Sequence, residues 1–164
     1  MSLLTLKSHN SEQTKLLGSY LGKLAQRGDI YLLIGDLGAG KTCLVQGISH
    51  GLGVKEYAFS PSFVIVREYH GRLPLFHVDF YRLDHIKEID NLGLEEYLHG
   101  DGVCVVEWAD KGMPALPRNN LLIELSYIPN RETQRTIVLK PNGQRYLKLM
   151  EQLKLNLNKE KTWN

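Results

Sequence analysis

The stretch IYLLIGDLGAGKT (30–42) constrains the fold of this chain more than any other part of the sequence. Its nearly all-apolar start, IYLLI (30–34), is typical of a strand buried on both faces of a sheet. The loop GDLGAGKT (35–42) matches G-x-x-x-x-G-K-[ST] at every fixed position, and CLVQGISHGLG (43–53) continues with apolar residues at helical spacing. A strand, a glycine-rich loop and a helix in this order predict the start of a parallel α/β sheet.

The loop itself predicts a nucleotide phosphate site. Its glycines let successive backbone N–H groups point at phosphate oxygens, and the following helix adds the positive end of its dipole. Lys41 would reach the β- and γ-phosphates, and the Thr42 hydroxyl would bind Mg²⁺. We therefore expect ATP and Mg²⁺ as cofactors. The expected cofactor-binding residues are Asp36, Leu37, Gly38, Ala39, Gly40, Lys41, Thr42 and Cys43, with the Asp36 side chain turned away from the phosphates.

Length and composition predict one ordinary globular domain. The 164 residues fit a single core, and a net charge of +2 is too mild for a dedicated nucleic-acid binder. No apolar run approaches the roughly 18 residues that a membrane span needs, and no signal peptide is visible. We expect a cytoplasmic protein. Its two cysteines, Cys43 and Cys104, lack metal-ligand spacing and are interpreted as buried free thiols.

The rest of the pattern predicts a mixed sheet flanked by helices. Amphipathic helices are expected at 11–26 and 145–155, and one or two short helices within 84–98. Strands are expected at 3–7, 63–70, 73–81, 103–108, 121–128 and 135–141, with two antiparallel hairpins among them. The predicted fold is a P-loop NTPase-like three-layer α/β sandwich. A single domain would span 1–155, and 156–164 would form a flexible polar tail.

Two acidic residues are candidates for completing the site. A phosphate-loop enzyme needs a carboxylate near the metal, at the end of an apolar strand. Glu107 closes the run VCVVE and fits this position best, while Asp79 lies in LFHVDFYR. Taken alone, each acid is better explained as an ordinary surface or strand-end carboxylate. With a phosphate loop in the same chain, we expect Asp79 and Glu107 to be catalytic, and Thr42 and Glu107 to bind the metal.

Four motifs together carry a resemblance to a known family. GDLGAGKT, SPSF (60–63), HVDFYR (77–82) and VEW (106–108), in this order, resemble the TsaE family of small bacterial ATPases. The resemblance runs from about the first helix through Trp108. It implies an accessory ATPase of tRNA threonylcarbamoyladenosine synthesis, in which Asp79 is the functional aspartate and Glu107 the metal-site acid. The family usually has SPTF where this chain has SPSF, so Ser62 keeps the hydroxyl and loses the methyl group.

The resemblance also implies partners. They are the two-subunit threonylcarbamoyl transferase complex and, through it, tRNA, with no membrane involved. On this basis we expect ATP hydrolysis that is weak in the isolated chain and is activated by the complex.

Three other functions share the phosphate loop. A small-molecule kinase needs an arginine-rich lid, but the basic residues after Glu107 are scattered: Lys111, Arg118, Arg131 and Arg135. A regulatory GTPase would need its D-x-x-G motif after a buried strand, whereas DNLG (90–93) follows a polar helical stretch. A nucleotide-dependent scaffold without useful turnover would have the same sequence features and stays open as an alternative.

Overall fold

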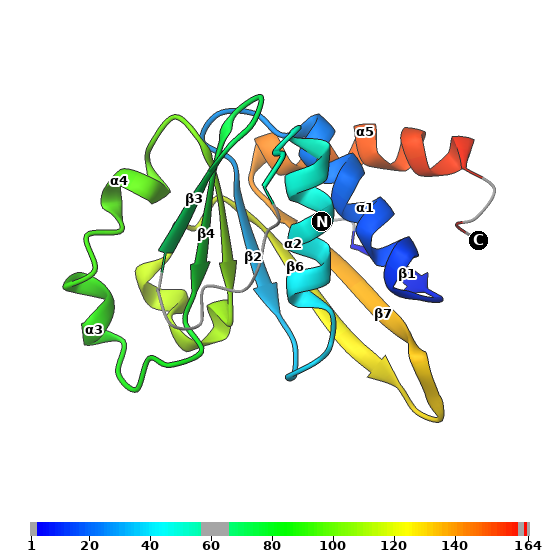
Figure 1. The fold of residues 1–164 in the computed structure, drawn as a ribbon, viewed down its shortest axis with the longest axis horizontal. Helices are drawn as coiled ribbons and strands as arrows, with labels where there is room; N and C mark the ends of the chain where they lie inside the picture. Colours follow the sequence, from blue (N-terminus) through cyan, green and yellow to red (C-terminus); the bar gives the residue numbers. More distant parts are fainter. Residues whose placement is uncertain (1–2, 57–65, 161–162, 164) are drawn as a thin grey trace.

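A seven-stranded mixed sheet forms the centre of the fold. The computed structural model describes residues 3–56, 66–160 and 163, so the segment SPSF with Ser62 lies outside the described residues (Figure 1). The sheet order is β1-β7-β6-β2-β5-β4-β3. The strands are β1 (Leu4–Ser8), β2 (Ile30–Ile34), β3 (Val66–His70), β4 (Pro74–Asp79), β5 (Val103–Glu107), β6 (Asn120–Ile128) and β7 (Arg131–Asn142).

The strands that follow the buried-strand pattern form the parallel centre of this sheet. β2 pairs in parallel with β5 and β6, and β4 pairs in parallel with β5. The outer pairs β1–β7, β6–β7 and β3–β4 are antiparallel. The predicted mixed α/β sheet with antiparallel strands is therefore confirmed.

Helices cover both faces of the sheet and give it three layers. The long helices α1 (Ser11–Leu24), α2 (Lys41–Gly51) and α5 (Gln144–Lys159) share one core with Tyr31 and Leu33 of β2. The short helices α3 (Lys87–Asp90) and α4 (Glu95–Leu98) cover the other face, together with the turns Ala109–Lys111 and Met113–Ala115. Ile30 and Leu32 point to that second core. Alternate residues of β2 thus serve opposite faces, as a buried central strand requires.

Glycines bring α1 and α2 into close contact. A Cβ atom added to Gly18 would lie 2.4 Å from the Leu44 carbonyl oxygen, and one added to Gly47 would lie 2.2 Å from the Lys15 carbonyl oxygen. Any larger side chain at these positions would push the two helices apart. The close crossing fixes the position of α2, whose first residue is Lys41.

Two predicted boundaries were wrong by four residues. Helix α5 continues to Lys159 beyond the predicted end at 155, because Leu157 extends the apolar stripe of Leu149 and Leu153 at helical spacing and is buried. The proposed polar tail therefore begins inside a helix. Strand β7 starts at Arg131 rather than at 135, because the exposed Arg131 is the register partner of Ile128 in β6, and the register then shifts before the pair Tyr127 and Arg135. Backbone pairing of this kind needs no apolar side chain.

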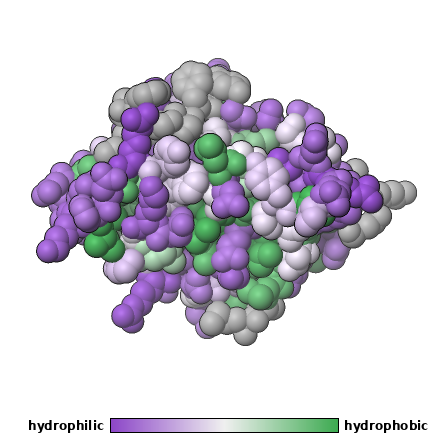
Figure 2. All heavy atoms as spheres, turned by 90° about the horizontal axis from the view of Figure 1, so that it is seen from below, coloured by the Kyte–Doolittle hydropathy of each residue, from purple (hydrophilic) through white to green (hydrophobic). Residues whose placement is uncertain are grey.

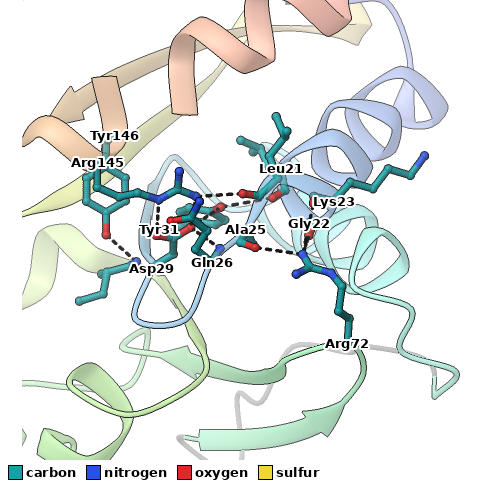
Figure 3. A network of polar contacts seen from close by, with 12 residues as sticks. Leu21, Gly22, Lys23, Ala25, Gln26, Asp29, Tyr31, Arg72, Arg145 and Tyr146 are labelled. Atoms are coloured by element: carbon teal, nitrogen blue, oxygen red, sulfur yellow. Dashed lines mark hydrogen bonds and ion pairs between the residues drawn. The ribbon is translucent and has the colours of Figure 1, made fainter. Parts of the chain in front are cut away.

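A partly buried ion pair joins Asp29, the residue before β2, to Arg145 at the start of α5 (Figure 3). Arg145 donates from Nε to Asp29 Oδ1 at 2.8 Å and from Nη2 to Asp29 Oδ2 at 2.7 Å. The hydrogen bonds to Asp29 raise the pKa of the Arg145 guanidinium. Tyr146 accepts a hydrogen bond from the Ile30 backbone N–H at 2.9 Å. This network holds the amino end of β2, the strand that leads into the glycine-rich loop.

We predict that Arg145→Ala lowers the free energy of unfolding by about 3 to 5 kcal/mol. The Asp29 side chain is only 2% exposed and would lose its bidentate partner, which leaves an uncompensated buried carboxylate. Arg118→Ala removes a nearby exposed arginine and is the matched control. Urea denaturation followed by circular dichroism measures both variants, and equal stability of the two would contradict the assigned role of this ion pair.

Within the described ranges, no helix combines the length and the apolar character that crossing a bilayer requires.

Candidate functional site

The glycine-rich loop lies at the carboxyl edge of the parallel strands, between the end of β2 and the start of α2 (Figure 1). A cavity of about 400 Å³ opens beside it. The loop residues that line this cavity are Leu37, Gly38, Gly40, Lys41, Thr42 and Cys43. Asp79 and Glu107 line it from the last positions of β4 and β5, and Tyr81, Arg82 and Trp108 line it from the segments that follow these strands. The structure therefore brings six of the eight predicted loop residues and both predicted acids into one site. Asp36 and Ala39 are outside the cavity lining.

The backbone of the loop has the curvature that a phosphate cradle needs. Gly38 and Gly40 have φ angles of 79° and 106°, a region that residues with a Cβ rarely adopt. The Ala39 N–H donates to the Asp36 carbonyl oxygen at 3.0 Å and closes a turn within the loop. This turn leads directly into the N-terminus of α2, where helical N–H groups without an intrahelical partner favour a bound anion.

Lys41 is the buried cation of the site. The residue is only 4% exposed. Its ammonium group donates hydrogen bonds to the carbonyl oxygens of Gly35 and Asp36. The ammonium also lies 4.1 Å from the centre of the Trp108 ring. Burial lowers the pKa of Lys41, while Glu107 and Asp79 act in the opposite direction. A cation in this position is suited to charge-assisted hydrogen bonds with phosphate oxygens.

Glu107 is held by donors from two other elements. The Thr42 hydroxyl donates to both carboxylate oxygens, at 2.9 Å and 3.2 Å. His77 Nε2 lies 2.5 Å from Glu107 Oε2, and the His77 side chain is completely buried. Sequence reasoning gave His77 no role of its own. The sequence did hold a signal for His77, namely its position two residues before Asp79. Residues two apart on a strand point to the same face, so His77 could have been expected on the same face as this acid.

Asp79 lies beside Glu107 because β4 and β5 are neighbouring parallel strands. The two acids are partners in the strand register, and both are buried. Asp79 Oδ1 accepts a hydrogen bond from the Tyr81 backbone N–H at 2.8 Å, which fixes the orientation of the carboxylate at the strand end. Two carboxylates and a hydroxyl thus converge on one wall of the cavity.

These oxygen atoms fit Mg²⁺ better than a transition metal. Mg²⁺ is usually held by one or two carboxylates together with waters and substrate phosphates. In the part of the chain that the structure describes, no cluster of three or more His, Cys, Asp and Glu residues could hold a metal alone. Thr42 and Glu107 match the smaller protein contribution that Mg²⁺ takes when a nucleotide supplies the remaining ligands.

Trp108 and Tyr81 form the outer wall of the cavity. Trp108 has a φ angle of 57°, and its ring centre lies 4.9 Å from that of Tyr81. Lys111 donates to the Tyr81 carbonyl oxygen and lies near both rings. The structure places its ring directly over Lys41, so Trp108 belongs to the site.

The two cysteines differ in environment. Both are free thiols, as predicted, but only Cys104 is buried, and burial raises its pKa to about 12. Cys43 is partly exposed at the loop, and its thiol donates to the Ser11 carbonyl oxygen at 3.3 Å. The expectation of two buried thiols was therefore wrong for Cys43, which follows Thr42 in the first turn of α2.

The parallel strands, the glycine-rich loop at their carboxyl edge and the lysine that begins α2 define an α/β protein of the P-loop NTPase-like class. The comparisons with known proteins go further. The family model described as "Threonylcarbamoyl adenosine biosynthesis protein TsaE" matches residues 8–137, and the chain belongs to this family.

Curated relatives and a solved structure agree with this membership. The chain is 42% identical over 154 residues to the tRNA threonylcarbamoyladenosine biosynthesis protein TsaE of Bacillus subtilis, covering 93% of this chain and 95% of the relative. The protein of the same name from Treponema pallidum is 37% identical over 130 residues, which are 79% of this chain and 96% of the relative. A crystal structure of Bacillus subtilis YdiB superposes with a TM-score of 0.84 at 38% identity, covering 96% of this chain and 97% of that one.

Proposed function

We propose that this chain binds Mg·ATP and hydrolyses it to drive turnover of the complex that makes threonylcarbamoyladenosine in tRNA. The observation that carries the proposal is the convergence of Lys41, Thr42, Asp79 and Glu107 on one cavity beside a phosphate loop. The proposed process is taken from the names of the two relatives, which are both called tRNA threonylcarbamoyladenosine biosynthesis proteins. The proposal places the chain in the cytoplasm.

Each residue at the site has a role that follows from its chemistry. The loop N–H groups and Lys41 bind the β- and γ-phosphates. Thr42 and Glu107 hold Mg²⁺, which when bound neutralises charge on the phosphate oxygens. Asp79 orients the attacking water or a water of the metal, since its carboxylate is fixed by the Tyr81 N–H beside Glu107. In this scheme the phosphate is transferred only to water.

The face around the cavity supports the involvement of a partner protein. Figure 2 shows the molecule from the side on which the glycine-rich loop lies, and apolar side chains interrupt a mostly hydrophilic surface there. Leu37 is 71% exposed and Tyr81 is 41% exposed, and both line the cavity. Exposed apolar side chains at the mouth of a site are suited to contact with another protein. The partner that we propose is the two-subunit threonylcarbamoyl transferase, with tRNA reached through it.

We predict that the isolated chain hydrolyses ATP slowly and that the transferase pair with tRNA accelerates it. ATP can bias the complex only if one of its conformations binds the nucleotide-loaded chain better than another. The test compares single-turnover and multiple-turnover hydrolysis of the chain alone, with the purified transferase pair, and with the pair and tRNA. Fast hydrolysis by the lone chain with no partner effect would contradict the proposal. Transfer of the γ-phosphate to a metabolite would favour a kinase, and binding without any turnover would favour a scaffold.

A further inference from the structure

The hairpin of β6 and β7 contacts the outer side of the phosphate loop. Tyr127 Oη donates to the Leu37 carbonyl oxygen at 2.7 Å. Arg135 donates from Nε to the Ala39 carbonyl oxygen at 3.2 Å and from Nη2 to the Gly38 carbonyl oxygen at 3.3 Å. Three consecutive carbonyl groups of the loop are thus held by two side chains that are far away in the sequence.

The two donors form one unit. Tyr127 and Arg135 are partners in the β6–β7 register, and the guanidinium carbon of Arg135 lies 4.3 Å from the centre of the Tyr127 ring. Arg135 also donates to the carbonyl oxygens of Glu132 and Gln134 at 2.6 Å and 2.8 Å. Its donors therefore serve backbone carbonyl groups of the loop and of its own strand. These hydrogen bonds fix the plane of the guanidinium group, and its donors bind backbone carbonyl groups.

Holding a carbonyl group also sets the direction of the next N–H group. In a trans peptide the C=O of one residue and the N–H of the next lie in one plane and point in opposite directions. Donors on the carbonyl oxygens of Leu37 and Ala39 therefore turn the N–H groups of Gly38 and Gly40 away from the hairpin. Among the backbone hydrogen bonds of the described residues, none uses either of these two N–H groups as a donor. They remain able to bind an anion.

We infer that Tyr127 and Arg135 are positioning residues that orient the phosphate-binding N–H groups of the loop before the nucleotide arrives. The inference rests on the proposed function, because it concerns the phosphate-binding step of that same site. Such preorganisation removes an ordering cost from binding, so its loss weakens nucleotide affinity. Neither residue needs to touch the nucleotide for this effect.

The packing of the hairpin against the loop supports this role. A Cβ atom added to Gly35 would lie 2.6 Å from the Leu125 carbonyl oxygen, and one added to Gly38 would lie 2.5 Å from Tyr127 Oη. Strand β6 therefore lies directly behind the loop. The glycine at 35 is needed for this close approach of two backbones, and the glycine at 38 is needed for backbone curvature, with a φ angle of 79°.

The test measures Mg·ADP and Mg·ATP affinity by calorimetry for Tyr127→Phe and Arg135→Lys. Tyr127→Phe removes one hydroxyl from a residue that is 46% exposed, so the fold should be retained. We expect affinity about 3- to 10-fold weaker, the range of one net hydrogen bond. Arg135→Lys keeps the charge but loses the planar fork, and we expect a similar loss. Arg131→Ala is the matched control, since it removes an exposed arginine at the start of the same strand.

A second measurement follows the loop itself. The amide signals of Gly38 and Gly40 in nitrogen-15 nuclear magnetic resonance spectra of the nucleotide-free protein report the local peptide orientation. We expect them to shift and broaden in Tyr127→Phe and Arg135→Lys, and to stay unchanged in Arg131→Ala. A merely structural role of the hairpin would lower the melting temperature but leave these two signals and the affinity in place.

The outcomes separate this inference from the proposed function. If the wild-type chain binds neither nucleotide, the proposed function fails, and so does the inference that rests on it. If the wild type binds and both variants bind equally well, only the positioning role is refuted. If Arg131→Ala weakens binding as much as Arg135→Lys, the effect is electrostatic or global, and the positioning role is refuted as well.

Discussion

Lys41→Ala is expected to abolish nearly all binding of Mg·ATP and Mg·ADP. The side chain is buried in the loop, and its charge interacts with the two acids Asp79 and Glu107. The N–H groups of the loop are dipoles and cannot replace a full positive charge opposite the β- and γ-phosphates. Isothermal titration calorimetry with each nucleotide measures the loss directly.

The matched control for this variant is Lys111→Ala. Lys111 is an exposed lysine near the same aromatic wall, with its ammonium 5.9 Å from the centre of the Trp108 ring. We expect it to change affinity little, because an exposed charge near the site is screened by solvent. If Lys41→Ala bound ATP as tightly as the wild type, the glycine-rich loop would not be a nucleotide site. If Lys111→Ala lost as much affinity as Lys41→Ala, net charge would explain the effect instead of the position of Lys41.

Buried strands were the part of the fold that could be predicted most closely. The run IYLLI was expected at 30–34, and β2 spans Ile30–Ile34, because a central strand needs apolar side chains on both faces. The start of β7 lies in polar sequence, so the hydrophobic pattern carried no signal for it. At the end of α5 the apolar stripe continues through Leu157 alone, within an otherwise polar stretch. Their structure depends on pairing with β6 and on a single buried leucine, Leu157, and both are tertiary effects.

The parts of the site that could be predicted are those that lie within a single sequence motif. The loop and its lysine follow from local sequence, and Glu107 could be assigned to a strand end. Asp79 was expected inside a strand at 73–81, whereas β4 ends at this residue. Their adjacency could not be predicted, because it depends on β4 lying next to β5 in the sheet. The hydrogen-bond donors Tyr127 and Arg135, which hold the loop carbonyl groups, could not be predicted from the sequence. Tyr127 is 90 residues from Leu37 and belongs to no phosphate motif. Sequence patterns report local structure, whereas such contacts are decided by the sheet order.

Asp79→Ala and Glu107→Ala are expected to lower the rate of ATP hydrolysis far more than nucleotide affinity. The loop backbone and Lys41 supply most of the affinity, whereas the two carboxylates order the metal, its waters and the attacking water. Removing a positioned catalytic group typically lowers the rate by about 10²- to 10⁴-fold. The measurement is single-turnover hydrolysis with saturating transferase pair and tRNA, next to calorimetry with the same variants. Asp84→Ala, an exposed aspartate in the loop after β4, is the matched control.

The two acids should differ in their dependence on Mg²⁺. Glu107 shares hydrogen bonds with Thr42, the other expected metal ligand, so Glu107→Ala should require a higher Mg²⁺ concentration for half-maximal rate. Because His77 contacts Glu107 in a buried position, Glu107→Gln is a second variant that keeps the shape of the side chain. Asp79→Ala should keep the Mg²⁺ dependence of the wild type and lose rate at every concentration. If both acids can be removed without loss of rate, they are structural. If both shift the Mg²⁺ dependence equally, they act on the metal together, and the attacking water must be oriented by another group at the carboxyl edge of the sheet.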